Sequence, residues 1–278
     1  MDSKGNDEQT ALWNGASGQS WVEAQELLDQ MFVRFEELLV DAASAKPRTR
    51  VLDVGCGTGS TTMAVERRIG AECQCVGVDI SEPMLEHARS RAKRADSRVD
   101  FICADAQRYA FERDSFDMIL SRFGVMFFED SVRAFENLHS AARKDAELCV
   151  IAWRSASDNP FMTAAERAVA PILPGLVARD ADEPGQFRFA DSARVRHILD
   201  SSGWQKIDIR PIDVECRFPE RDLMRYVTRL GPVGRALREA DEETRARVLA
   251  AVRPAFAPYV LGDEVRFDAA CWKVVANA

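Results

Sequence analysis

The sequence is poor in histidine, has no long apolar run and starts with a polar segment. Only three histidines occur among its 278 residues. His87, His139 and His197 all fall in stretches with helical periodicity, so none stands out as a general base. No uninterrupted apolar segment approaches the ~18 residues of a membrane helix, and residues 1–9 lack the apolar core of a signal peptide. We therefore expect a cytoplasmic protein with no membrane partner.

An excess of positive charge and a metal-type cysteine arrangement are also absent. Lys and Arg number 37 against 45 Asp and Glu, a formal net charge of −8, whereas nucleic-acid-binding domains usually present a basic patch. We therefore expect no nucleic-acid partner. Cys73 and Cys75 have no matching second pair and no nearby histidine, which predicts no metal site. Buried free thiols in a reducing compartment are the preferred interpretation of the seven cysteines.

An alternation of strand and helix patterns runs through the middle of the chain. Short apolar runs predict buried strands at residues 50–54, 74–79, 99–104, 116–120 and 147–153. The segments between them predict helices at residues 61–68, 83–94 and 131–142. This order indicates a mostly parallel sheet with helices on both faces.

Helical and irregular segments flank this core. Apolar residues at helical spacing predict a cover helix over residues 18–44. Later segments predict a helix at 192–202 and strands at 206–216 and 265–276. Two stretches are predicted to form a lid: 155–190, with one helix near 161–170, and 220–258, a helical insert broken by Gly231-Pro232. We expect a disordered tail at 1–10 and a single domain at 11–278, whose core spans about 41–153.

A glycine-rich turn follows the first strand. Gly55, Gly57 and Gly59 allow close backbone approach, and the next helix offers unpaired N–H groups to an anion. A dinucleotide fingerprint needs glycine where this chain has Ser60, so the spacing disfavours NAD, and no Gly-Lys-Ser/Thr follows to make a phosphate loop. Asp53 adds negative charge near the same crevice, which suits a ligand with ammonium and carboxylate groups. A turn that serves packing alone is the alternative.

Two carboxylates end the next two strands. Asp79 ends the strand at 74–79 and is suited to accept hydrogen bonds from two ribose hydroxyls. Asp105 follows the strand at 99–104 and is suited to accept from the exocyclic amine of adenine, beside the Ala106 N–H. Helix capping for Asp79 and solvation in a loop for Asp105 are the simpler alternatives. Because ligands of parallel sheets bind at the carboxyl ends of the strands, the three features together indicate a nucleotide-like ligand.

In this order, the motifs resemble the class I S-adenosylmethionine-dependent methyltransferases. The run Asp53-Val54-Gly55-Cys56-Gly57-Thr58-Gly59 matches the family's first motif, Asp79 its ribose-binding acid and Asp105-Ala106 its adenine-binding pair. Ser121-Arg122-Phe123 is similar to the segment that meets the methionine part, and Met84 to the residue that packs on adenine. Trp13 and Trp21 are similar to the N-terminal cover of bacterial small-molecule members.

The resemblance implies a fold, a cofactor and a set of binding residues. The fold is α/β, a doubly wound, Rossmann-like, seven-stranded sheet, mostly parallel with an antiparallel last strand, with an N-terminal helical cover and a helical lid insert. The cofactor is S-adenosyl-L-methionine. The cofactor-binding residues that it implies are Trp13, Trp21, Asp53, Gly55, Cys56, Gly57, Gly59, Asp79, Ile80, Met84, Asp105, Ala106, Ser121, Arg122 and Phe123.

The activity that the resemblance implies is methyl transfer to a small-molecule acceptor by in-line displacement, in which positioning dominates catalysis. A non-catalytic S-adenosylmethionine-binding regulator or subunit and a quinone-type carbon methyltransferase stay open as alternatives. Arg122 is suited to meet an anionic substrate, with a structural ion pair as the alternative, and residues 123–128 line either the acceptor pocket or plain core. No catalytic residue is assigned, the acceptor atom stays open, and we expect a monomer or a homodimer.

Overall fold

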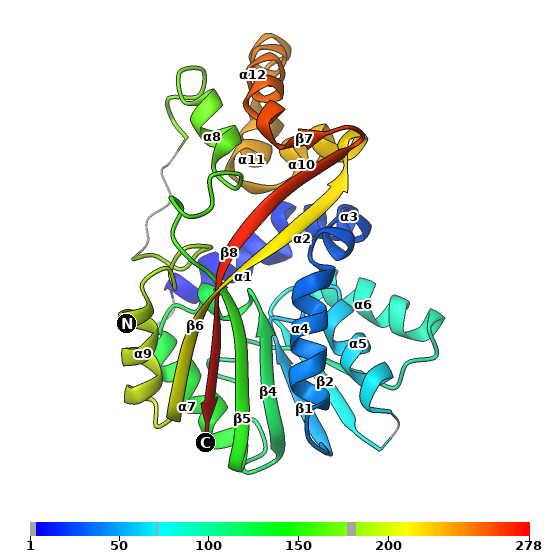
Figure 1. Ribbon diagram of the computed structural model, residues 1–278, viewed down its shortest axis with the longest axis vertical. Coiled ribbons are helices and arrows are strands. Elements are labelled where there is room, and N and C mark those ends of the chain that lie inside the picture. The colour runs from blue at the N-terminus through cyan, green and yellow to red at the C-terminus, as the bar shows by residue number, and fades with distance from the viewer. Residues whose placement is uncertain (1–3, 71, 177–181) are drawn as a thin grey trace.

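The strands form one mixed sheet in the order β3-β2-β1-β4-β5-β8-β6 (Figure 1). The structure is a computed structural model and describes residues 4–70, 72–176 and 182–278. The strands are β1 (Arg50–Val54), β2 (Gln74–Asp79), β3 (Asp100–Cys103), β4 (Phe116–Arg122), β5 (Ala142–Trp153), β6 (Gln205–Pro219), β7 (Val260–Leu261) and β8 (Glu264–Asn277). Strands β1 to β5 are parallel, and β8 runs antiparallel to both β5 and β6. The predicted count of seven is one short because β7, which pairs with β8, has only two residues and leaves no readable pattern.

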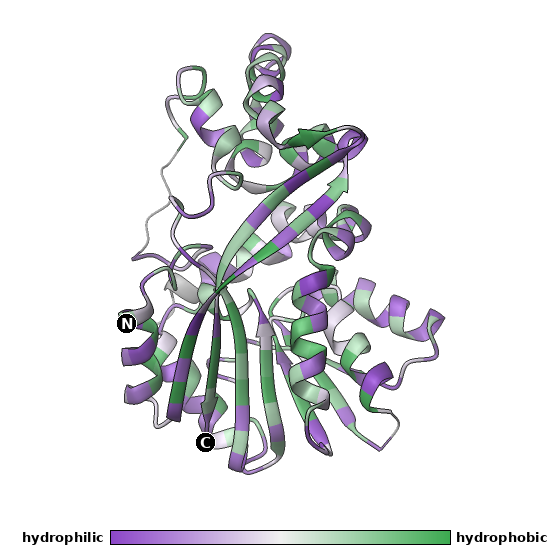
Figure 2. Ribbon diagram, viewed as in Figure 1, coloured by the Kyte–Doolittle hydropathy of each residue, from purple (hydrophilic) through white to green (hydrophobic). Residues whose placement is uncertain are grey.

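Helices cover both faces of this sheet, as the alternating pattern predicts. On one face lie α4 (Val33–Ser44), α5 (Ser60–Ile69) and α6 (Glu82–Arg94); on the other lie α7 (Ser131–Ala141) and α9 (Ser192–Ser201) (Figure 1). The central strands are buried on both sides, and residues 148–153 of β5 are all buried. Figure 2 shows them as apolar bands in the middle of the sheet. This double burial explains why these strands read as continuous apolar runs in the sequence.

The predicted cover helix at 18–44 is wrong as one element, because the chain turns twice within it. The structure has α2 (Ala16–Glu23), α3 (Gln25–Met31) and α4, with joints at Ala24 and Phe32. Both joints are buried apolar residues, 1% and 6% exposed. The two turns let the apolar faces of all three helices pack against the core, which one straight helix of this length would not do.

The prediction of a disordered tail at residues 1–10 is also wrong from Lys4 onward, because α1 (Lys4–Asn14) is helical. Residues 1–3 lie outside the described residues. The Asn14 amide donates to the Ile80 carbonyl at 2.9 Å and accepts from the Glu82 N–H at 3.0 Å, and the Ser81 hydroxyl donates to the Trp13 carbonyl at 2.6 Å. These contacts cross more than sixty positions of sequence, so local composition does not reveal them.

The two stretches predicted to form a lid come together above the sheet. The lid, as named here, consists of α8 (Ala164–Val169), α10 (Leu223–Arg229), α11 (Gly231–Glu239), α12 (Glu242–Ala255), β7 and the far ends of β6 and β8 (Figure 1). Its interior is aromatic: Phe161 stacks on Phe267 with ring centroids 3.8 Å apart and meets Phe256 edge-on at 5.2 Å. Residues 177–181 of the first stretch lie outside the described residues.

The lid rises on a two-stranded ribbon. Strand β5 pairs with β8 only from Cys271 to Asn277, whereas β6 pairs with β8 along its whole length, from Asn277 back to Glu264. The ribbon therefore continues beyond the sheet, as Figure 1 shows for the yellow and red strands. The N-terminal helices α1 to α3 lie between the upper edge of the sheet and the lid (Figure 1).

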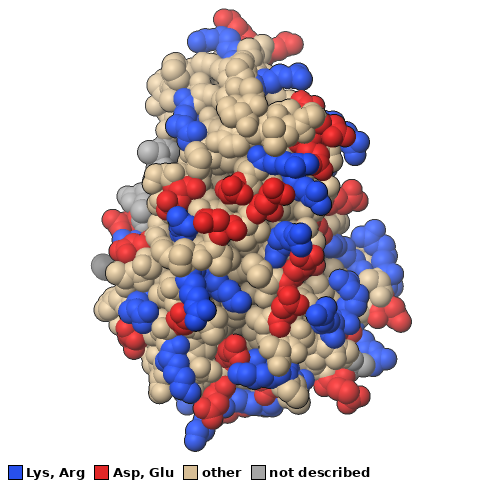
Figure 3. Space-filling view, viewed as in Figure 1, with Lys and Arg blue, Asp and Glu red and all other residues tan. Residues whose placement is uncertain are grey.

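The surface carries mixed charge. Figure 3 shows Lys and Arg interspersed with Asp and Glu on the face in view. Across the part of the chain that the structure describes, no helix is long and apolar enough to cross a bilayer. All seven cysteines are free; Cys103 is exposed, contrary to the expectation of buried thiols, because β3 is the edge strand of the sheet.

Candidate active site

A cavity of about 480 Å³ lies between the carboxyl ends of the central strands, the N-terminal helices and the lid. This volume is within the ~300–1,000 Å³ typical of small-molecule sites. Of the residues predicted to bind the cofactor, those that line it are Trp13, Trp21, Gly55, Gly57, Asp79, Ile80, Met84, Asp105, Ala106, Arg122 and Phe123. Asp53, Cys56, Gly59 and Ser121 are not part of this lining.

The glycine turn is held in a backbone conformation that other residues rarely adopt. Gly55, Gly57 and Gly59 have φ of +67°, +54° and +79°, in the region that glycine reaches without a steric penalty. The Gly55 N–H donates to the Val78 carbonyl at 2.8 Å, which ties the turn to β2. A Cβ atom at Gly55 would lie 2.6 Å from Gly124 Cα. The turn therefore needs glycine both for its dihedral angles and for the approach of the backbone that follows β4.

Asp79 braces the glycine turn from the end of β2. Its Oδ2 accepts from the Gly57 N–H at 2.8 Å, and its Oδ1 accepts from the Ser81 N–H at 2.9 Å. Burial raises the pKa of Asp79, and the hydrogen bonds from Ser81 and Gly57 oppose that rise. The side-chain cap of α6 is Ser81, which accepts from the Met84 N–H. Asp79 is therefore not the side-chain cap of α6, and it lines the cavity.

Asp105 and Ala106 lie beyond the end of β3, and both line the cavity. The Asp105 Oδ1 accepts from the Gln107 N–H at 2.9 Å, which fixes the carboxylate in its loop. The Ala106 carbonyl accepts from the Asn137 amide at 2.8 Å. Both residues are thus held by neighbouring groups at the cavity, and the adenine-binding role of Asp105 stays a prediction.

Asp53 does not place its charge in the crevice, which corrects the expectation from the sequence. Its carboxyl faces α5 and accepts from the Thr62 hydroxyl at 2.7 Å. Burial raises its pKa to about 6, although the Thr62 hydrogen bond and the Arg122 charge act in the opposite direction. Asp53 therefore joins β1 to the first turns of α5 behind the cavity wall.

Ser121, Cys56 and Gly59, which also lie outside the lining, support the glycine turn from the side away from the cavity. The Ser121 hydroxyl donates to the Val54 carbonyl at 2.7 Å and accepts from the Gly124 N–H at 3.1 Å. Cys56 is buried against β2, and its burial raises the pKa of the thiol. A Cβ atom at Gly59 would lie 2.6 Å from the Phe101 ring.

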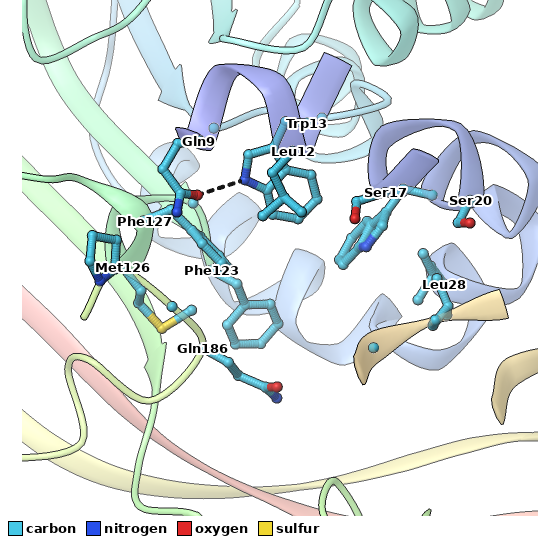
Figure 4. Close-up of a pocket in the computed structure, with 18 of the residues that line it drawn as sticks. Gln9, Leu12, Trp13, Ser17, Ser20, Leu28, Phe123, Met126, Phe127 and Gln186 are labelled. Carbon is cyan, nitrogen blue, oxygen red and sulfur yellow. Dashed lines mark hydrogen bonds between the residues drawn. The ribbon is translucent and has the colours of Figure 1, made fainter. Parts of the chain in front are cut away.

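The N-terminal cover closes the cavity with aromatic rings. Trp13 meets Phe127 edge-on at 5.2 Å and Trp21 at 5.9 Å. Its indole N–H donates to the Gln9 side chain at 3.2 Å, the dashed line in Figure 4. Figure 4 shows Leu12 and Trp13 on one side of the space and Phe123, Phe127 and Gln186 on another. The docking of α1 is what places Trp13 there.

The sequence predicts the upper half of the cavity only as two lid stretches, whose residues Phe161, Tyr226, Arg229, Gly231 and Pro232 line it. Lining residues of this half that the sequence does not single out include Met162, Glu166, Glu183, Gln186, Leu230, Arg235 and Phe256. The irregular segment 183–187 has no periodicity that would predict its place; its Gly185 N–H donates to the Met126 carbonyl at 3.1 Å. In the run 123–128, Phe123, Met126, Phe127 and Phe128 line the cavity, which favours the pocket interpretation over plain core.

Arginines of the lid reach across to the N-terminal cover. Arg238 donates to the Ala16 carbonyl at 2.8 Å and to the Ser20 hydroxyl, and Arg229 pairs with the Glu23 carboxylate. Both arginines also line the cavity. The lid and α2 therefore meet through charge-assisted contacts at the rim.

Comparison with known proteins agrees with this geometry. A family described as a methyltransferase domain matches the chain over residues 51–145. The demethylmenaquinone methyltransferases of Staphylococcus haemolyticus and Renibacterium salmoninarum are 25% and 29% identical over 173 and 185 residues. These alignments cover 59% and 66% of this chain, and 72% and 75% of those relatives. The YcgJ protein of Bacillus subtilis shares the fold with a TM-score of 0.58 at 19% identity, over 88% of this chain and 98% of that one.

The chain belongs to the class I S-adenosylmethionine-dependent methyltransferases. This methyltransferase is an enzyme that uses S-adenosylmethionine as its methyl donor, which removes the alternative of a non-catalytic subunit. Its cavity fits that cofactor: two carboxylates lie at the strand ends, and Arg122 Nη1 is buried without a hydrogen-bond partner among the described residues. Which residues of the methyltransferase contact the cofactor stays a prediction. In the described part of the chain, no group of three or more His, Cys, Asp or Glu side chains is placed to hold a metal ion.

Proposed function

We propose that this methyltransferase acts on an apolar small molecule that carries a flat ring, of the quinone type, held between the glycine turn and the lid. The observation that carries the proposal is the character of the upper half of the cavity. Its walls include the rings of Phe127, Phe128, Phe161, Tyr226 and Phe256 together with the thioethers of Met126 and Met162. Aromatic and thioether side chains favour contact with an apolar aromatic face.

Two relatives support this acceptor class. The proteins of Staphylococcus haemolyticus and Renibacterium salmoninarum are named for demethylmenaquinone, a quinone with an apolar tail. Each match covers more than two thirds of the relative's length. A quinone-type ring carbon is therefore our leading acceptor atom, and a ring hydroxyl is the second.

The residues of the chain act mainly by position in this proposal. When bound, S-adenosylmethionine supplies a methyl group that its sulfonium already activates. Asp79 and Asp105 orient the nucleoside, and the aromatic cover over Trp13 keeps water from the reaction space. In the reduced form of the ring, loss of a hydroxyl proton makes the neighbouring ring carbon nucleophilic, so no strong base is required. After that carbon takes the methyl group, with S-adenosylhomocysteine as the leaving group, it loses its hydrogen as a proton, which restores the aromatic ring. A reaction that requires no strong base agrees with a cavity whose described lining contains no histidine.

Calorimetry with S-adenosylhomocysteine tests the part of the proposal that concerns cofactor binding. Asp79→Ala removes a carboxylate that accepts two backbone hydrogen bonds, and we expect its affinity to fall at least roughly tenfold. Asp100→Ala is the matched control, because Asp100 begins β3 at the exposed end and pairs only with Gln74 among the contacts that the structure describes. Equal affinities in both variants would contradict the assignment of Asp79.

Transfer of a radiolabelled methyl group to a panel of acceptors tests the proposed acceptor class. We expect turnover with reduced naphthoquinones and none with small aliphatic amines or phosphorylated amines. Met162→Glu places a charge among the aromatic rings, so we expect a higher KM for the acceptor and an unchanged Kd for S-adenosylhomocysteine. Turnover with polar aliphatic acceptors alone would refute the ring proposal while leaving the methyl donor established.

A further inference from the structure

The hydroxyl of Tyr226 contacts a thioether in the aromatic upper half of the cavity. Tyr226 lies on α10 and Met162 just before α8, so their contact joins the two lid stretches (Figure 1). The Tyr226 hydroxyl donates to Met162 Sδ at 3.5 Å, and both residues line the cavity. A thioether sulfur is a weak acceptor. An oxygen atom brought by a ligand is therefore a better partner for this hydroxyl.

Other rings hold the ring of Tyr226, so its hydroxyl has a defined place. The Tyr226 centroid is 5.6 Å from that of Phe161 and 5.6 Å from that of Phe218, with interplanar angles of 34° and 37°. Phe161 and Phe218 are both buried. Met162, in contrast, has a flexible side chain of the kind that adapts to irregular gaps. A ligand can thus displace the thioether while the Tyr226 ring stays in place.

Four charged residues of the upper half are less suited to hold an oxygen atom of an acceptor ring. Glu166 and Glu183 line the cavity, and a carboxylate repels an oxygen that becomes negatively charged. Arg229 and Arg238 are engaged with the N-terminal cover. The phenol of Tyr226 is neutral and donates one O–H, which matches a ring oxygen before and after that oxygen loses its proton.

We infer that Tyr226 is a specificity-determining residue, whose hydroxyl leaves Met162 and donates a hydrogen bond to an oxygen atom on the acceptor ring. This inference rests on the ring acceptor of the proposed function. Through this bond the enzyme selects rings that carry oxygen over rings of the same shape that do not. A ligand without the oxygen gains no such bond and leaves the hydroxyl with its weak partner.

A purely structural role is the competing explanation, in which the hydroxyl only fixes Met162 and thereby the lid. Met162→Leu separates the two explanations, because leucine keeps a similar apolar volume but accepts no hydrogen bond. If the hydroxyl serves the acceptor, this variant keeps the affinity for oxygen-bearing rings. If the hydroxyl serves the lid, this variant behaves like Tyr226→Phe.

The experiment compares two rings of the same shape, each titrated by fluorescence into protein saturated with S-adenosylhomocysteine. One is reduced naphthoquinone, a dihydroxynaphthalene kept under reducing conditions, and the other is the dimethylnaphthalene with methyl groups at the same two positions. For Tyr226→Phe we expect a roughly tenfold loss of affinity for the dihydroxy ring and less than a twofold change for the dimethyl ring. With the dihydroxy ring as acceptor, kcat/KM for methyl transfer falls roughly tenfold in the same variant.

Tyr259→Phe is the matched control, because it removes the same atom from the same aromatic cluster. The Tyr259 ring also packs against Phe161, with centroids 5.1 Å apart, but Tyr259 is not part of the cavity lining. We expect both rings to bind this variant as they bind wild-type protein. For Met162→Leu we expect the affinity for the dihydroxy ring to stay within about twofold of wild type.

The possible outcomes separate the inference from the function it rests on. Equal losses with both rings in Tyr226→Phe, or no loss with either, would overturn the role of Tyr226. A loss in Met162→Leu equal to that in Tyr226→Phe would assign the hydroxyl to the lid and overturn it as well. Wild-type protein that binds neither ring would refute the ring acceptor of the proposed function, and the inference with it. An unchanged Kd for S-adenosylhomocysteine in each variant shows that its fold is intact.

Discussion

The docking of the N-terminal cover depends on the side chain of Asn14, and Asn14→Ala tests this dependence. The amide donates to the Ile80 carbonyl and accepts from the Glu82 N–H, at 2.9 and 3.0 Å. Each such hydrogen bond contributes about 0.5–1.5 kcal/mol, so the pair supplies about 1–3 kcal/mol of docking free energy. This corresponds to a change of about 5- to 150-fold in the ratio of docked to undocked α1.

Hydrogen exchange followed by mass spectrometry measures that ratio. We expect the amides of α1 in Asn14→Ala to lose protection by this factor, while β1 and β4 keep theirs. The affinity for S-adenosylhomocysteine falls in parallel, since Trp13 leaves the cavity wall. Gln9→Ala is the comparison on the same helix: it removes only the contact with Trp13 four residues away, so α1 stays docked. Unchanged protection of α1 in Asn14→Ala would refute the reasoning and assign the docking to apolar packing.

Three more substitutions probe other parts of the structure. Asp53 has its pKa raised from 3.8 to about 6, so the folded state holds its proton more tightly than the unfolded state. Stability therefore declines by about 3 kcal/mol as the pH rises from about 4 to about 6, and Asp53→Asn removes this decline in calorimetric Tm. Gly124→Ala places a Cβ 2.5 Å from the Val54 carbonyl and is expected to cost about 1–3 kcal/mol in chemical unfolding. Phe161→Ala removes the ring stacked in the lid and is expected to cost about 3–5 kcal/mol.

Each of these predictions has an outcome that would contradict it, and the last two have a control variant. A decline in Tm that persists in Asp53→Asn would show that other groups cause the pH dependence. Gly175→Ala introduces a Cβ that meets nothing within 4 Å, so an equal loss there would contradict the steric argument for Gly124. Tyr109→Ala removes a ring that is 37% exposed, and a loss in Phe161→Ala no larger than this one would contradict the lid core.

The lower half of the candidate site was predictable because its signals are local. The three glycines have positive φ in a turn that no other residue fits easily, so their spacing is visible in the sequence. Asp79 stands at the end of an apolar strand, where parallel sheets bind ligands. A strand pattern does not show to which side a buried side chain at the strand's end points. For this reason the sequence placed the Asp53 carboxylate near the crevice, whereas in the structure it faces Thr62.

The sequence predicts the upper half only as two lid stretches, because distant contacts determine which of their residues reach the cavity. The docking of α1 depends on hydrogen bonds from Asn14 to the turn after β2, across more than sixty residues. A backbone hydrogen bond from Gly185 to the Met126 carbonyl joins the segment 183–187 to the loop after β4, and the segment has no periodic pattern. The joints at Ala24 and Phe32 are ordinary apolar residues, which carry no sequence sign of a turn.

The two-stranded ribbon of β6 and β8 has a consequence for how this enzyme diversifies. The helices α10 to α12 leave the sheet at Pro219 and return at Glu264, two residues that face each other across the ribbon. A chain segment whose two ends are already paired can be lengthened, shortened or replaced at little cost in loop-closure entropy. The paired register from Gln205 to Pro219 would hold any replacement at the same height above the glycine turn. The upper wall of the cavity, where we propose that the acceptor binds, is thus a part that can be exchanged, whereas the lower wall with the glycine turn is built into the sheet.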